Sequence, residues 1–190
     1  MIDVYVVNNA SEGSIDRAVK LLAGIKGGAG KAIGSAIRRT ITSTEAFAAK
    51  EIRKEYLVSA GDFKRYTHSE KKITSGTDGT TMGITFSGYH IPLIHFASSI
   101  TSKGRVSVRV KRSSGRQVLD HVFYTGAVSH PGLYERTTPS RLPIEGKMGP
   151  STPQMMSANE EVKEEIGKHI QETFEKRLDH EILAIMNGWR

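Results

Sequence analysis

Hydrophobic residues return every three or four positions through two long stretches of the chain, which predicts two long helices. The first stretch runs from about residue 29 to residue 56, and its stripe consists of Ile33, Ile37, Ile41, Thr44, Ala48 and Ile52. The second runs from about Asn159 to Met186, and its stripe consists of Val162, Ile166, Ile170, Phe174, Leu178 and Ile182. Four residues turn an α-helix by about 400°, so this second stripe drifts by about 40° per step. We expect the second helix to curve or to meet two partners in turn.

Shorter elements are expected before the first long helix. Alternation at Ile2, Val4 and Val6 predicts a short strand, and Ser14 is expected to cap a short helix. Glycines between Gly24 and Gly34 predict a flexible joint rather than a phosphate-binding loop. A phosphate-binding loop requires Ser or Thr after its Gly-Lys pair, and here Ala follows.

Between the long helices the hydrophobic period changes from helical to alternating, which indicates strands. The clearest example is a hairpin in which valines at 106, 108 and 110 alternate with basic or polar residues. A turn at residues 113–115 leads to a return strand at 118–124. Other short strands are expected at residues 67–74, 81–87 and 91–96.

The order of helix, strands and helix favours segregated layers. We therefore predict an α+β fold, in which an antiparallel β-sheet of about four to six strands from residues 67–136 is flanked by a long N-terminal helix and a C-terminal helix. We interpret the 190 residues as a single domain. Its consecutive parts are an N-terminal strand with helices (1–58), a β-rich core (59–136), an extended arm (137–157) and the C-terminal helix (158–190).

The composition narrows the classes of function. The chain has no cysteine, which excludes a disulfide scaffold, a thiolate zinc finger, an iron–sulfur cluster and a cysteine nucleophile. Its first residues lack the features of a signal peptide, and its aliphatic runs are far shorter than the roughly 18 residues of a membrane-spanning helix. We expect a soluble protein of a cytosol-like compartment that makes no contact with a membrane.

Charge is unevenly distributed along the chain, whose formal net charge is +7. Residues 151–190 contain 5 Lys and Arg against 8 Asp and Glu, whereas residues 1–150 contain 22 against 12. A basic body with an acidic end segment suits contact with a polyanion such as DNA, or head-to-tail association between copies. A merely soluble surface is the third interpretation.

No arrangement of residues predicts an active site, so we expect no enzyme, no metal and no cofactor. His180 and Glu181 resemble the start of a zinc-protease motif, but Ala184 stands where the second histidine would be. The histidines show no metal-ligand spacing, no serine lies in a Gly-x-Ser-x-Gly elbow, and no two acids stand out as an acid–base pair.

The predicted hairpin carries a run of positive charge with no acid between Lys103 and Gln117. A ribbon with one basic face fits a phosphate backbone or an acidic protein, and an edge strand protected by charge is an equally weighted alternative. Because aromatic residues are absent from this face, we do not expect sequence-specific or single-strand recognition. The candidate contact residues are Lys103, Arg105, Arg109, Lys111, Arg112 and Arg116.

An extended segment at residues 141–151 is too apolar for a solvated loop. We interpret it as a docking or ordering arm, with an ordinary loop packed on its own core as the alternative. The candidate interface residues are Arg141, Leu142, Pro143, Ile144, Gly149, Pro150 and Ser151.

Several segments together carry a family resemblance. The most specific is the Leu-Pro-Ile…Gly-Pro-Ser block within 141–151, and the others are residues 36–40, 53–58, 91–96, 106–110, 122–124, 132–136 and the charged helix 160–182. Over most of its length the chain resembles the minor tail protein Z family of long-tailed phages and prophages.

This resemblance implies a non-enzymatic structural protein that acts in tail completion and tail–head joining. Such a protein would form a homo-oligomeric ring on the tail tube and bind other phage tail or neck proteins. It would be located in the virion tail, and in the host cytoplasm during assembly, with possible non-specific contact with packaged DNA. The alternatives are a small basic DNA-binding protein without sequence preference, acting outside any particle, and an uncharacterised enzyme.

Overall fold

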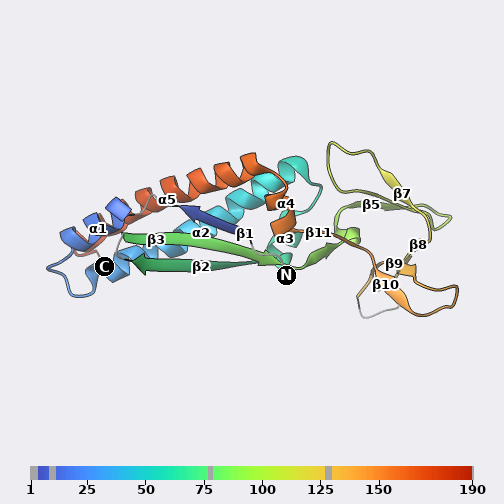
Figure 1. Cartoon of the computed structure of the whole chain (residues 1–190), viewed down its shortest axis with the longest axis horizontal. Helices are drawn as coiled ribbons and strands as arrows, with labels where there is room; N and C mark the ends of the chain where they lie inside the picture. The colour runs from blue at the N-terminus through green and yellow to red at the C-terminus, as the bar shows by residue number, and fades with distance from the viewer. Residues whose placement is uncertain (1–3, 9–11, 77–78, 127–129, 190) are drawn as a thin grey trace. The chain divides into compact units, whose positions relative to one another are not determined.

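The computed structural model describes residues 4–8, 12–76, 79–126 and 130–189, and for residues 4–8, 12 and 71–84 it describes the backbone alone. The chain divides into two compact units that interleave along the sequence (Figure 1). Among the described residues, unit 1 comprises 49–67 and 88–158, and unit 2 comprises the rest. The units do not follow the four consecutive segments expected from the sequence, because both ends of the described chain and the strands around residues 68–87 gather in unit 2.

Unit 2 combines long helices with a small sheet. Its elements are β1 (Val4–Asn8), α1 (Glu12–Leu21), α2 (Gly28–Glu55) as far as Ala48, β2 (Thr67–Gly76), β3 (Gly79–Gly88) and α5 (Glu160–Met186). The strand order is β1-β3-β2, and β1 pairs with β3 in an antiparallel register that sets Val4 opposite Phe86. Helix α5 packs against α1 and β1 and runs antiparallel to α2.

The core of unit 2 follows the predicted stripe of α5, since all six predicted residues from Val162 to Ile182 are buried. Asn159 caps the helix, and its side chain accepts a hydrogen bond from the backbone N–H of Val162 at 3.3 Å. The buried stripe moves around the helix as expected. Near the C-terminal end of α5, Glu181 and Ile185 are buried as well as Ile182. Helix α5 therefore meets several partners, as its drifting stripe requires.

In α2 the buried residues agree with the predicted stripe in part. Ile33 and Ile41 are only half-buried, whereas a line of small residues at every fourth position is buried. That line consists of Ala32, Ala36, Thr40, Thr44 and Ala48. The hydroxyl of Thr40 donates to the carbonyl of Ala36 at 2.9 Å, which lets a polar residue occupy the core. Four members of the predicted stripe, Ile37, Thr44, Ala48 and Ile52, are buried as expected, so within this line the prediction missed only the contribution of Ala32, Ala36 and Thr40.

The start of the chain also differs in detail from the prediction. Helix α1 begins at Glu12, so Ser14 lies in its first turn rather than at its N-cap. The glycine-rich joint is divided: Gly27 adopts a positive φ of 70° in the turn before α2, whereas Gly30 and Gly34 lie inside the helix. The predicted strand at Ile2–Val6 includes residues outside the described part, and β1 covers Val4–Asn8.

Unit 1 contains short helices and short strands. Beside the end of α2, its elements are α3 (Ala60–Tyr66), β4 (His90–Pro92), the 3-10 helix η2 (Leu93–His95), β5 (Ala97–Ile100), β6 (Val106–Arg109), β7 (Gln117–Leu119), β8 (Val122–Thr125), β9 (Gly132–Arg136), β10 (Ile144–Gly146), β11 (Met148–Ser151) and α4 (Thr152–Ser157). Its strands form the sheets β5-β6-β7, β10-β9-β8 and β11-β4.

The predicted α+β class with its long N-terminal and C-terminal helices is confirmed. The expectation of one sheet with four to six strands is wrong, because the described strands form separate sheets of two or three. In unit 1 these strands are only three to five residues long, so turns interrupt the ladder before a wider sheet can form.

The predicted hairpin ends earlier than expected. Strand β6 pairs with β7, setting Val108 opposite Gln117, and the chain then turns at His121, whose φ is 64°. The second half of the expected return strand, β8, pairs with β9 instead, setting Val122 opposite Glu135. The predicted return strand, residues 118–124, is therefore divided between two different sheets.

Replacing Ile170 with Ala tests the importance of the α5 stripe. Ile170 is fully buried, so we expect Ile170→Ala to lower the free energy of unfolding by about 2–5 kcal/mol. Leu183→Ala is the matched control in the same helix, because Leu183 is 58% exposed and should change the free energy by less than about 0.5 kcal/mol. Urea denaturation followed by circular dichroism measures both, and equal losses would contradict the assigned core.

Candidate functional site

The basic hairpin, residues 103–117, turns an apolar face into unit 1. Val106 and Val108 are buried, whereas Ser107 and Arg109 are only half-buried. Strand β6 pairs with β5 on one side and with β7 on the other, so the two valines lie on the central strand of a three-stranded sheet. The predicted alternation is confirmed for Val106–Arg109, whereas Val110 lies beyond the strand and is half-buried.

Three of the six predicted contact residues bind other parts of unit 1. Lys111 Nζ donates to Glu55 Oε1 at 2.9 Å. The guanidinium of Arg109 donates to the carbonyls of Lys111 and Arg112, and that of Arg112 donates to the carbonyl of Arg53 at 3.0 Å. Positive groups beside the last carbonyls of a helix are favourable, so Lys111 and Arg112 join the hairpin to the end of α2, whereas the bonds of Arg109 stay within the hairpin.

Backbone hydrogen bonds reinforce this joint. The N–H of Leu57 donates to the carbonyl of Val110 at 2.8 Å, and that of Arg112 donates to the carbonyl of Glu55 at 2.7 Å. Lys111, Arg109 and Arg112 therefore have a structural task. The sequence did not indicate it, because Glu55 and Lys111 are 56 residues apart.

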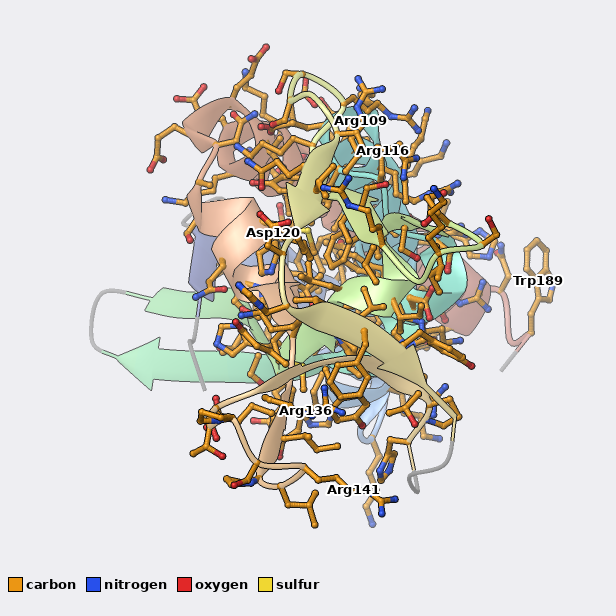
Figure 2. All side chains as sticks on the ribbon, turned by 90° about the vertical axis from the view of Figure 1, so that its right-hand side faces the viewer. Arg109, Arg116, Asp120, Arg136, Arg141 and Trp189 are labelled. Carbon is orange, nitrogen blue, oxygen red and sulfur yellow. The ribbon has the colours of Figure 1, made fainter. Side chains whose placement is uncertain are left out.

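The remaining predicted cations face solvent, together with two arginines from further along the chain. Arg105 is 69% exposed, with its guanidinium 3.9 Å from Asp120, and Arg116 donates to a backbone carbonyl of β6 at 3.3 Å. Figure 2 shows Arg116, Arg136 and Arg141 around the side of unit 1 that faces the viewer. We call the following exposed residues the cationic face: Lys103, Arg105, Arg116, Arg136 and Arg141.

Positive charge is concentrated in the unit that carries this face. Unit 1 contains 14 Lys and Arg against 6 Asp and Glu, whereas unit 2 contains 13 against 14. The excess positive charge of the whole chain therefore belongs to unit 1.

The contact between Lys111 and Glu55 changes the acidity of the lysine. The hydrogen bond that Lys111 donates to the Glu55 carboxylate, together with the neighbouring Tyr56, raises the pKa of Lys111 above its usual value. The ammonium also lies 5.0 Å from the centroid of the Tyr56 ring, where a cation is attracted to the aromatic face. The charged form of Lys111 is therefore the form that holds the hairpin.

Replacing Lys111 with Met tests this contact through its pH dependence. A raised pKa in the folded state means that the stabilisation is present below the usual lysine pKa and is lost as pH rises through the folded-state value. We expect Lys111→Met to lower the melting temperature at about pH 8, and this deficit to shrink at about pH 11.5. Lys103→Met is the control, because Lys103 is exposed on the cationic face. A deficit of equal size at both pH values would contradict the contact.

The predicted arm, residues 141–151, is anchored in unit 1 along its second half. Strand β10 pairs with β9, and β11 pairs with β4. A Cβ atom added at Gly149 would lie 2.6 Å from a ring carbon of Phe96, so no larger residue fits there without a shift of the ring. Ser151 is buried and forms a capping box with Gln154 at the start of α4.

An ion pair holds the base of the arm. Lys147 Nζ donates to Glu135 Oε2 at 2.7 Å, which lowers the pKa of Glu135 below its usual value. The start of the arm is exposed, since Leu142 is 65% exposed. Gly149 and Ser151 thus order the arm, whereas Leu142 and Arg141 are presented to solvent.

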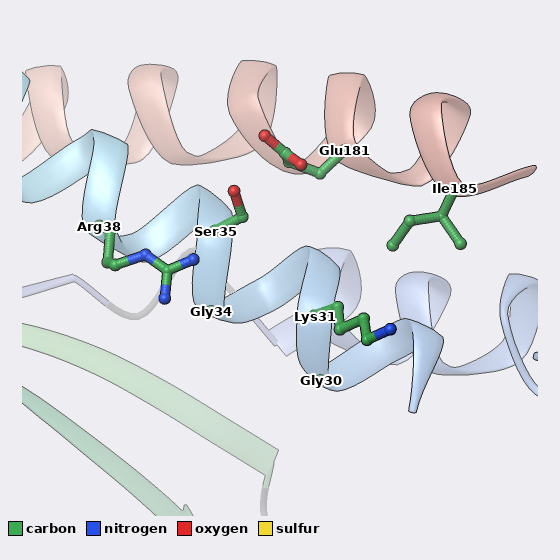
Figure 3. Close-up of a pocket in the computed structure, with 7 residues that line it drawn as sticks. All are labelled: Gly30, Lys31, Gly34, Ser35, Arg38, Glu181 and Ile185. Carbon is green, nitrogen blue, oxygen red and sulfur yellow. The ribbon is translucent and has the colours of Figure 1, made fainter. Parts of the chain in front are cut away.

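A cavity of about 300 Å³ lies in unit 2 between the first turns of α2 and the last turns of α5 (Figure 3). Gly30 and Gly34 leave the backbone of α2 bare on one side, and Arg38 lines the same wall. Buried Glu181 comes from α5, and its carboxylate lies 3.3 Å from Nε of Arg39. The charge of this carboxylate is therefore compensated within unit 2.

The structure also brings together a chain of polar groups that the sequence did not reveal. His95 binds Asp62 through Nδ1 at 2.9 Å and Tyr66 through Nε2 at 3.2 Å. Ser59 donates to the second carboxylate oxygen of Asp62 at 2.6 Å. Both ring nitrogens of His95 thus hold α3 to η2. His95 is about 30 residues from Asp62 and Tyr66 in the sequence, so no local motif predicts these contacts.

The described residues hold no group of three or more His, Asp or Glu side chains arranged for a metal ion. Within the same residues, no helix combines the length and the apolar character needed to cross a membrane.

No protein-family model matches the chain, and neither a curated protein nor a solved structure matches it significantly. The family resemblance therefore rests on the sequence segments that carry it.

Proposed function

We propose that the protein is a non-enzymatic structural subunit of a phage or prophage tail. It acts in tail completion and tail–head joining, assembles with other copies into a ring, and binds other tail or neck proteins. Its location is the virion tail, and the host cytoplasm during assembly. The sequence segments described above support the family, and the geometry of unit 1 supports an assembly role.

The observation that carries the proposal is the construction of the arm. Its base is ordered by strand pairing, by the tight position at Gly149 and by the buried Ser151. Its tip presents Leu142 to solvent, beside Arg141. An ordered segment with an exposed apolar residue loses little conformational entropy on binding, which is favourable for a contact between subunits.

Deleting the gene from the phage or prophage that encodes the chain tests the proposed function. We expect particles whose tails fail to join heads, or joined particles with defective tail ends, in electron micrographs. Supplying the wild-type chain from a plasmid should restore infectious particles. Normal infectious particles after the deletion would overturn the proposal.

Replacing Leu142 with Asp tests the arm itself. Leu142 is exposed, so we expect Leu142→Asp to leave the melting temperature nearly unchanged while the plasmid-borne variant fails to restore infectious particles. Ile144→Asp should fail in the same assay and also lower the melting temperature, because Ile144 is half-buried and pairs with Arg136.

Ile100→Asp is the matched control for Leu142→Asp, since Ile100 is an exposed aliphatic residue of unit 1 outside the arm. The control variant should restore infectious particles. If Leu142→Asp restores them equally well, the arm makes no contact in assembly.

A further inference from the structure

We propose that the cationic face of unit 1 binds the outward face of α5 in a second copy of this chain. The inference rests on the proposed function, because it names the partner of a surface that includes Arg141 of the arm. It adds which residues of the two copies meet.

The outward face of α5 is defined by helical geometry. At about 100° per residue, its members fall within an arc of about 100° on the helix surface. The exposed or half-buried members are Glu161, Glu164, Glu165, Lys168, Glu172, Glu175, Asp179, Leu183 and Met186, of which Asp179 is bound by Arg17 of α1. Among the residues that the structure describes, none of these five glutamates forms an ion pair, in contrast to Glu160, which binds Lys163.

The two faces are complementary in charge. The cationic face belongs to the unit with 14 basic and 6 acidic residues, and α5 belongs to the unit with 13 and 14. The exposed glutamates Glu161, Glu164 and Glu172 of one copy can therefore meet exposed cations of another, and opposite potentials speed and orient such an encounter.

The two faces are also complementary in apolar surface. Leu142, beside the cation Arg141, is 65% exposed. On α5 the acidic part of the outward face is followed by Leu183 and Met186, which are 58% and 54% exposed. Leu142 of one copy can thus contact Leu183 and Met186 of another, while Arg141 beside it contacts a glutamate.

A protein partner fits the cationic face better than DNA does. Asp120 lies 3.9 Å from Arg105, and Glu145 is exposed on β10 close to the arm. A phosphate backbone is negative throughout and would meet these carboxylates unfavourably. The outward face of α5 has mixed charge, since Lys168 interrupts its glutamates, and so it can accommodate acids among the cations.

Such a contact joins two different surfaces, so each copy can bind two neighbours. Contacts of this kind generate closed rings or open filaments according to the rotation between copies. Because much of the contact is ionic and exposed, salt should weaken it.

Charge reversal tests the contact with purified full-length chains. The first variant combines Glu161→Lys, Glu164→Lys and Glu172→Lys, and the second combines Lys103→Glu, Arg105→Glu and Arg141→Glu. The control combines Asp16→Lys, Glu70→Lys and Glu160→Lys, which changes the net charge of unit 2 by the same amount at exposed positions outside the outward face. Sedimentation velocity at about 100 μM protein in about 50 mM and about 500 mM salt measures the association.

We expect the wild-type chain and the control to self-associate in low salt and to dissociate in high salt. Each reversal variant alone should associate at least about tenfold more weakly than the wild type. An equimolar mixture of the two variants should associate again, because each reversed face then meets an opposite charge on the other variant.

Two results would overturn the inference. One is a wild-type chain that stays monomeric in low salt, including a chain that instead binds a random-sequence DNA duplex through the cationic face. The other is a mixture of variants that stays monomeric while the wild type associates. These measurements use purified protein alone, so their failure is distinct from a failure of the proposed function, which the deletion experiment decides.

Discussion

Unit 2 depends on the burial of two lines of side chains that are spaced by four residues. In α5 the line consists of large apolar residues from Val162 to Ile182, and in α2 it consists of small residues from Ala32 to Ala48. The two helices run antiparallel, and polar contacts such as that between Ser43 and His169 (3.0 Å) lie beside the core. Both lines are buried in the core of unit 2, and a cavity of about 300 Å³ remains between the first turns of α2 and the last turns of α5.

Unit 1 depends on a different interaction. Positive side chains of the hairpin bind a carboxylate and backbone carbonyls at the end of α2. Lys111, Arg109 and Arg112 satisfy a carboxylate and backbone carbonyls, and so they are engaged within the unit. The cations that remain for a partner lie elsewhere in the hairpin, at the end of β9 and on the arm. The same residue type thus has two tasks in one short segment, and only the three-dimensional contacts separate them.

Features that depend on local periodicity could be predicted from the sequence. The α+β class, both long helices and every buried position of the α5 stripe follow from the spacing of apolar residues. The pairing of strands could not be predicted, because β1 joins β3 and β8 joins β9 through contacts that no local pattern records. For the same reason the sequence pointed to six equivalent cations, although distant partners such as Glu55 distinguish them.

The drift of the α5 stripe limits how the length of this helix can change. One residue inserted between Ile166 and Leu178 would rotate every later position by about 100°, which would turn Leu178 and Ile182 out of the core. An insertion of about 7 or 11 residues restores the phase to within about 20°, because it adds nearly whole turns. Helix α5 can therefore lengthen or shorten without exposing its buried side chains only by about two or three whole turns.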